Sequence, residues 1–230
     1  MKTNLTRDDA QNRAQLISNV RYDVHVDITG EDTFTTTSTI HFDSKAGTTH
    51  FDLVAREFEA TLDGKETGRE LSLDDDTHTL TVTSTEPYNR TGEGLHKFTD
   101  PVDGKDYLYT QFEPAMAMKV FACFDQPDLK APYAVSVKAP ADWSVIGNGA
   151  GEISDGGVWH LAETEPLSTY FVALCAGPYV SVRDEHDGIA LGLFARASLS
   201  EQLREHAPEM LEVTKQSFDY FHSIFGIRYP

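Results

Sequence analysis

Two polar side chains just before Pro114 are the strongest candidates for chemistry in this sequence. In the segment YLYTQFEP, Gln111 and Glu113 are separated by a single residue. Alternate residues of an extended strand share a face, so this amide and carboxylate should point the same way, together with Tyr107 and Tyr109. A carboxylate in that setting suits a ligand ammonium group, which donates charge-assisted hydrogen bonds. We expect Pro114 to end the strand, and Glu113 to be extended because a residue before proline avoids the helical region.

The elements that would position this pair are mostly short strands. Apolar and polar residues alternate from Val20 to Ile28 and from Phe34 to Phe42, as in antiparallel strands with one buried face. Asp63-Gly64 is typical of a hairpin turn. Further strands are expected over residues 49–53, 58–62, 70–73, 78–83, 133–139, 144–147, 158–161, 169–176, 179–183 and 189–195. The sequence therefore predicts a mainly β fold, an antiparallel multi-sheet sandwich or saddle.

A helix is expected near each end of the chain. Thr6 followed by Asp9 is typical of a helix start and predicts a short amino-terminal helix. After Ser198 the apolar spacing becomes helical and Pro208 suits a first helical turn, which predicts a long amphipathic helix that residues 226–230 end. Its apolar positions are Leu211, Thr214, Phe218, Phe221 and Phe225. This aromatic face either packs on the β region or stays exposed, and an exposed apolar stripe favours self-association.

The composition narrows the classes of partner. A formal net charge of -18, from 37 acidic and 19 basic residues, disfavours nucleic acid and anionic membranes as partners. No apolar run reaches the roughly 20 residues that span a bilayer, and the polar start of the chain does not resemble a signal peptide. We therefore expect a cytoplasmic protein. Cys123 and Cys175 both lie among apolar neighbours and are expected to be buried thiols.

Signatures of catalysis are missing from this sequence. None of its nine histidines has the i, i+4 partner and intervening glutamate of a helical zinc site. There is no Gly-x-Ser-x-Gly elbow, no cysteine-protease signature and no phosphate-binding glycine loop. Asp125 is expected to cap backbone amides in a turn. We expect no catalytic residue and no metal site in the chain itself.

Several stretches resemble the aminopeptidase N family, which are gluzincin zinc metallo-aminopeptidases, in its actinobacterial form. The central ones are Gln-x-Glu-Pro and Phe-x-Cys-Phe-Asp-x-Pro-x-Leu-Lys-Ala, and the others are TRDDAQNRA, RYDVHVDIT, GLHKFTDPVDGKDYLYTQFEP and FDYFHSIFGIRYP. They follow one another in the family's order along nearly the whole chain. The family's Gly-x-Met-Glu-Asn loop and His-Glu-x-x-His zinc motif do not occur here. The resemblance thus implies an amino-terminal fragment that lacks the zinc motif.

The resemblance also implies roles for parts of the chain. Residues 1–197 would form the amino-terminal β-saddle domain, and residues 198–230 would begin a truncated thermolysin-like catalytic domain. The parent would be a zinc-dependent aminopeptidase that releases amino-terminal residues from peptides. Glu113 would contact the substrate's α-amino group, Gln111 would border the pocket for the first side chain, and the domain would wall the active site. Its partners would be peptide substrates and the remainder of the catalytic domain. Zinc would be bound by the parent, and this fragment alone would bind none and be inactive.

Two other classes stay open at this point. One is a non-catalytic β-sandwich binding module, for carbohydrate or another protein, with residues 107–113 as a ligand platform. The other is a scaffold domain. A zinc motif within about a hundred residues downstream, a distance typical of a further domain portion, would decide for the enzyme.

Overall fold

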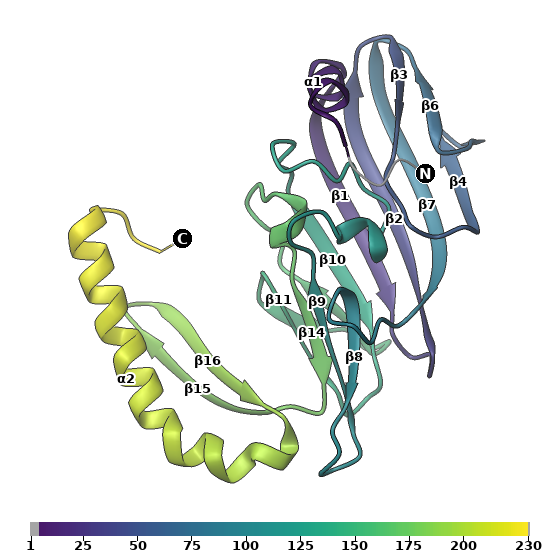
Figure 1. The fold of residues 1–230 in the computed structure, drawn as a ribbon. Coiled ribbons are helices and arrows are strands. Elements are labelled where there is room, and N and C mark those ends of the chain that lie inside the picture. The colour runs from purple at the N-terminus through teal and green to yellow at the C-terminus, as the bar shows by residue number, and fades with distance from the viewer. Residues whose placement is uncertain (1–4, 230) are drawn as a thin grey trace. The chain divides into compact units, whose positions relative to one another are not determined.

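The computed structural model describes residues 5–229, and the chain divides into two compact units (Figure 1). The first unit comprises Met1–Phe98 and Leu108–Ala176, and the second comprises Thr99–Tyr107 and Gly177–Pro230. The boundary at residue 197 expected from the sequence concerns the domains of a longer protein and stays a prediction.

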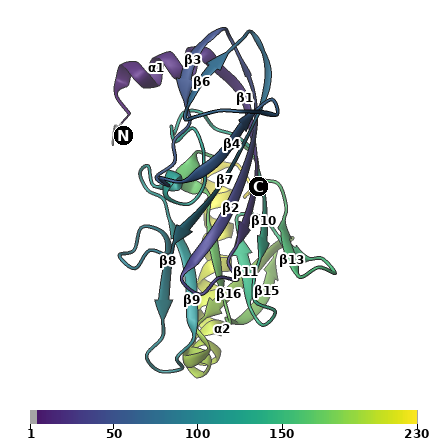
Figure 2. The ribbon, with the colours of Figure 1, turned by 90° about the vertical axis from the view of Figure 1, so that its right-hand side faces the viewer.

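The first unit is built on two main sheets. The larger contains, in order across the sheet, β12 (Gly151–Ile153), β13 (Val158–Leu161), β10 (Tyr133–Lys138), β1 (Ile17–Asp27), β2 (Thr33–Ser44), β7 (Asp76–Pro87), β4 (Phe58–Leu62) and β5 (Lys65–Glu66). Its central strands lie side by side in Figure 2. The smaller contains β11 (Ser144–Gly147), β14 (Leu174–Gly177), β9 (Asp106–Gln111) and β8 (Gly94–Thr99). The strands β3 (Gly47–His50) and β6 (Glu70–Leu73) form a separate pair.

The period-two pattern of the sequence determines which faces are buried. From Val20 to the end of β1, and along β2, every second residue is buried, so the two strands predicted from that pattern are confirmed. Tyr22 of β1 and Tyr133 of β10 stack with ring centroids 4.7 Å apart. One apolar core joins residues of both sheets, including Leu108 of β9. The mainly β fold with several antiparallel sheets is confirmed, with one difference: β1 and β10 pair in parallel.

The amino-terminal helix α1 (Arg7–Leu16) begins with the predicted capping box of Thr6 and Asp9. Its buried residue is a charged one, since Arg13 is only 2% exposed. Three further short turns are 3-10 helices, at Ala117–Lys119, Thr169–Phe171 and Ala197–Leu199. The strand expected over residues 169–176 is therefore wrong in its first half.

The second unit contains a hairpin of β15 (Val180–His186) and β16 (Ile189–Ala195), with the helix α2 (Ser200–Phe225) packed on it. Leu191, Ala207 and Leu211 form its small buried core. Because α2 begins at Ser200, the expectation that Pro208 lies in the first turn is wrong. The helix ends before Gly226, which adopts a left-handed backbone conformation with φ of 64°. Pro230, also expected to end it, lies outside the described residues.

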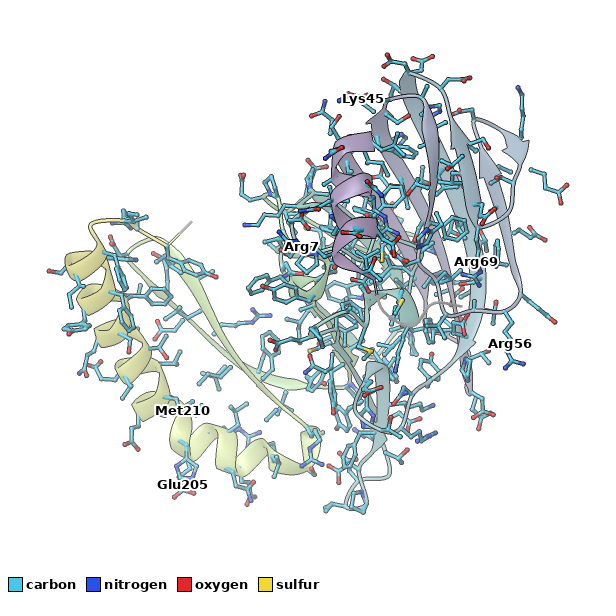
Figure 3. All side chains as sticks on the ribbon, turned by 45° about the horizontal axis from the view of Figure 1, so that its top comes forward. Arg7, Lys45, Arg56, Arg69, Glu205 and Met210 are labelled. Carbon is cyan, nitrogen blue, oxygen red and sulfur yellow. The ribbon has the colours of Figure 1, made fainter. Side chains whose placement is uncertain are left out.

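Part of α2 remains exposed in the described chain. Met210, labelled in Figure 3, is 50% exposed. Other exposed apolar side chains follow at helical spacing: Val213, Tyr220, Phe221 and Ile224. The helix thus packs one face on the hairpin and leaves an adjacent apolar face uncovered, while self-association through that face stays a prediction.

Candidate functional site

Gln111 and Glu113 lie at the end of β9 and in the turn that follows it. The strand ends at Gln111, so the expectation that Glu113 extends it is wrong. Proline has no N–H with which to continue a sheet, and the backbone N–H of Met116 instead donates to the carbonyl of Phe112 at 2.8 Å. Phe112 points into the core, while Gln111 before it and Glu113 after it are exposed. The amide and the carboxylate are therefore both presented to solvent.

Among residues 5–229, no basic side chain is bound to the carboxylate of Glu113. Within residues 5–229, no hydrogen bond or ion pair holds the side chain of Gln111 or Glu113. Lys119, the next cationic residue along the chain, forms an ion pair with Glu93. A carboxylate without an internal counter-ion retains its capacity to accept hydrogen bonds from a ligand ammonium group.

The two tyrosines expected beside this pair have different environments. Tyr109 is 38% exposed, and its ring lies 4.9 Å from the ring of His96 on the neighbouring strand β8. Tyr107 is only 2% exposed, and its hydroxyl donates to Asp103 at 2.9 Å. Tyr107 therefore does not lie on an open face with Gln111, because its ring packs against Tyr179 within the second unit.

A cluster of charged residues lies beneath α1, away from solvent. Arg13 donates to the carboxylate of Asp52 at 2.8 Å, and its guanidinium lies 5.7 Å from the ring centroid of Phe124. Asp125 accepts from the backbone N–H of Met118 at 3.2 Å, as its expected capping role requires. Burial is the main cause that raises the pKa of Asp125. These partners are all internal, so the cluster fixes α1 to the sheets.

Neither cysteine is an activated nucleophile. Cys123 is buried, as expected, and burial raises the pKa of its thiol well above the ordinary value. Cys175 is only partly buried, which differs from the expectation, and burial still raises its pKa. A raised thiol pKa leaves little of the reactive thiolate at neutral pH.

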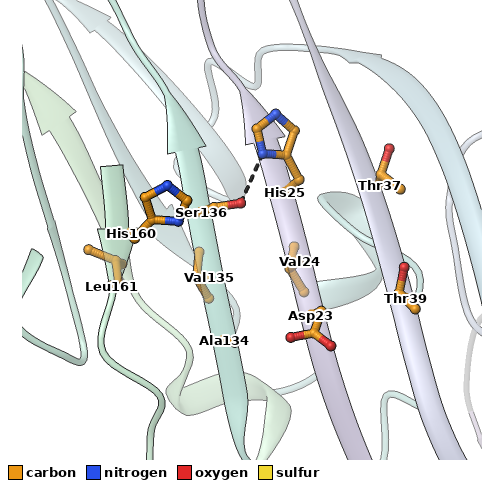
Figure 4. Close-up of a pocket in the computed structure, with 10 residues that line it drawn as sticks. All are labelled: Asp23, Val24, His25, Thr37, Thr39, Ala134, Val135, Ser136, His160 and Leu161. Atoms are coloured by element: carbon orange, nitrogen blue, oxygen red, sulfur yellow. Dashed lines mark hydrogen bonds between the residues drawn. The ribbon is translucent and has the colours of Figure 1, made fainter. Parts of the chain in front are cut away.

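The outer face of the large sheet has a shallow depression of about 280 Å³ (Figure 4). His25 and His160 lie on either side of Ser136, and a ring nitrogen of His25 lies 2.9 Å from the Ser136 hydroxyl oxygen. Among residues 5–229 no three histidine, cysteine or carboxylate side chains come together in a way that could hold a metal ion.

The helices of the described chain are also too short or too polar to cross a bilayer. The candidate site is therefore the exposed carboxylate of Glu113 beside the exposed amide of Gln111.

Comparison with known proteins identifies related sequences. The sequence profile of the peptidase M1 N-terminal domain matches residues 56–171. Aminopeptidase N of Streptomyces lividans is 40% identical over 99% of this chain and 29% of its own length. Aminopeptidase N of Acetobacter pasteurianus is 32% identical over 66% of this chain and 44% of its own length, and human glutamyl aminopeptidase is 31% identical over 59% and 15%. The chain spans less than half the length of these relatives.

Proposed function

Because the chain belongs to the peptidase M1 N-terminal domain family, we propose that it serves an aminopeptidase by binding the free amino end of a peptide substrate. The observation that carries the proposal is the carboxylate of Glu113, which is exposed in the turn after β9 and has no bound cation among residues 5–229. Gln111, exposed two residues before it, would border the pocket for the first side chain. The parallel with relatives named aminopeptidases favours this over a carbohydrate-binding module or a scaffold.

The strength of this recognition depends on the exclusion of water. An ion pair between exposed groups contributes only about 0–1 kcal/mol. The same pair is worth several times more where the effective dielectric constant falls. Glu113 in this chain is open to solvent, so we expect weak amine binding by the chain alone. Strong binding would need the remaining parts of the longer protein to cover the site, with this domain as one wall.

Bond cleavage would be performed by residues outside this chain. The described residues provide no donor set that fits zinc. Zinc in the parent protein would polarise the scissile carbonyl and activate a water molecule. We propose that residues 198–230 begin a thermolysin-like catalytic domain, and that the rest of this domain covers the exposed apolar face of α2. The role of the present chain is then to bind and orient the substrate.

Kinetics on the full-length protein test the proposal. We expect it to hydrolyse aminoacyl anilides and the chain alone to show no hydrolysis above buffer. Glu113→Ala should lower kcat/KM of the full-length protein by about tenfold or more, the value of one charge-assisted hydrogen bond. Glu59→Ala, on the outer face of the large sheet, is the matched control and should change kcat/KM little. Unchanged kcat/KM in Glu113→Ala would remove this carboxylate from the site.

A further inference from the structure

The ring of Tyr109 is held in a fixed position beside Gln111. On one side it packs against the imidazole of His96, with ring centroids 4.9 Å apart and planes inclined by 47°. The hydroxyl end of the Tyr109 ring adjoins the loop before β8. If Gly92 of this loop carried a Cβ atom, that atom would lie 4.0 Å from the hydroxyl oxygen of Tyr109. The remainder of the ring is exposed. A large apolar surface is therefore held at the candidate site with little freedom to move.

The loop that supports this ring is itself well anchored. The backbone N–H of Gly92 donates to Nδ1 of His96 at 3.1 Å, which places the proton of a neutral imidazole on Nε2. Asn89 accepts hydrogen bonds from the backbone and side chain of Thr91. Glu93 pairs with Lys119. Because the loop fixes His96 and His96 packs against Tyr109, the ring of Tyr109 forms a preformed wall. Ligand binding then costs little conformational entropy at this side chain.

The position of the wall relative to Gln111 follows from strand geometry. Residues two apart in a strand lie about 7 Å apart on the same face. This distance is comparable to the width of one amino-acid side chain. Both Tyr109 and Gln111 are exposed on β9, and Glu113 follows in the turn.

We propose that Tyr109, supported by His96, is a specificity-determining residue that selects peptides with a large apolar or aromatic first side chain. The inference rests on the proposed function, in which Glu113 binds the α-amino group and Gln111 borders the side-chain pocket. Apolar contact with the exposed part of the ring removes apolar surface of both groups from water. An acidic first side chain would be disfavoured by the carboxylate of Glu113 beside it.

The test compares substrates in the full-length protein. Alanyl, leucyl, phenylalanyl and lysyl anilides are assayed with wild type, Tyr109→Ala, Tyr109→Phe and His96→Ala. Tyr109→Ala should lower kcat/KM for the leucyl and phenylalanyl substrates by about tenfold relative to the alanyl substrate, a typical effect of lost apolar contact in a pocket. Tyr109→Phe should retain the wild-type preference. His96→Ala should weaken the same preference by less, because the ring loses its support but remains.

Controls separate this inference from the proposed function. Phe171→Ala removes a similarly exposed aromatic ring elsewhere in the first unit and should leave the substrate preference unchanged. Equal loss for all substrates in Tyr109→Ala, no loss, or a loss confined to the lysyl substrate would each overturn the assignment. If Glu113→Ala abolishes activity while Tyr109→Ala leaves the preference intact, the proposed function stands and this inference fails. If Glu113→Ala has no effect, the proposed function itself fails.

Discussion

Replacing Arg13 by leucine should destabilise the first unit strongly, although the residue lies on a short surface helix. Its guanidinium donates to Asp52 at 2.8 Å and to the carbonyl of His50 at 3.2 Å. It also lies over the ring of Phe124. Leucine would fill part of the volume but would satisfy neither oxygen. The carboxylate of Asp52 would then remain largely buried without its cation.

The contacts of Asp52 set the expected magnitude. Removing one partner of a buried ion pair costs about 3–5 kcal/mol. The side chain of Asp52 is still 18% exposed, and it accepts a hydrogen bond from the backbone N–H of Asp125 at 2.9 Å. These features reduce the penalty, so we expect about 3 kcal/mol for Arg13→Leu, at the lower end of that range. Arg21→Leu breaks an exposed pair with Glu163 and should cost at most about 1 kcal/mol.

Urea unfolding of the chain, followed by tryptophan fluorescence, measures this difference. Both tryptophans, Trp143 and Trp159, belong to the first unit and report on its unfolding. The double variant Arg13→Leu/Asp52→Asn should be more stable than Arg13→Leu alone, because asparagine removes the unpaired charge. Equal urea midpoints for Arg13→Leu and Arg21→Leu would refute this account of the cluster.

Two further predictions concern the strand β7 of the large sheet and the glycines in and near the turn between β4 and β5. Burial opposes the charge on His78, but hydrogen bonds, chiefly the one of 2.7 Å to the Asp63 carboxylate, outweigh it and raise its pKa. The protonated His78 therefore stabilises the folded state. This contribution is complete below the ordinary histidine pKa of about 6.5 and is lost as pH rises through the raised pKa. The urea midpoint of the wild type should fall as pH rises through this range, and that of His78→Gln should not. Identical pH profiles for the two proteins would contradict the assignment. Gly64→Ala should lower the free energy of unfolding by about 1 kcal/mol, because φ of Gly64 is 76°. Gly68→Ala is the control and should be tolerated, because Gly68 lies in open space and has no positive φ. Equal Tm values for the two variants in thermal unfolding would contradict this prediction.

Much of the fold could be predicted because its strands are amphipathic. The alternation in β1 and β2 identifies the buried face directly, and the Asp63-Gly64 turn joins β4 to β5 as predicted, with φ of 52° and 76° at the two residues. The parallel pairing of β1 with β10 could not be predicted, since strands over a hundred residues apart carry no sign of their relative direction in a period-two pattern. The short strand β8 was missed because glycines and turn residues surround it.

The site shows the same division between local and tertiary information. Exposure of Gln111 and Glu113 follows from local alternation and from the proline that ends the strand. The difference between Tyr107 and Tyr109 depends on neighbours distant in sequence, Tyr179 for one and His96 for the other. Arg13 was not singled out because an arginine in a short polar helix normally faces solvent. The opposing Asp52 and the carbonyl of His50, both distant in sequence, make its burial favourable.

The claim that Glu113 recognises a ligand ammonium group is tested most directly by a cycle of two ligands and two proteins. Inhibition constants of leucinamide and its N-acetyl derivative are measured for the full-length protein and its Glu113→Gln variant. Glutamine preserves the shape of the side chain and removes the charge. We predict that wild type prefers the free amine and that the variant loses about tenfold or more of this preference. An equal preference in both proteins would contradict the account.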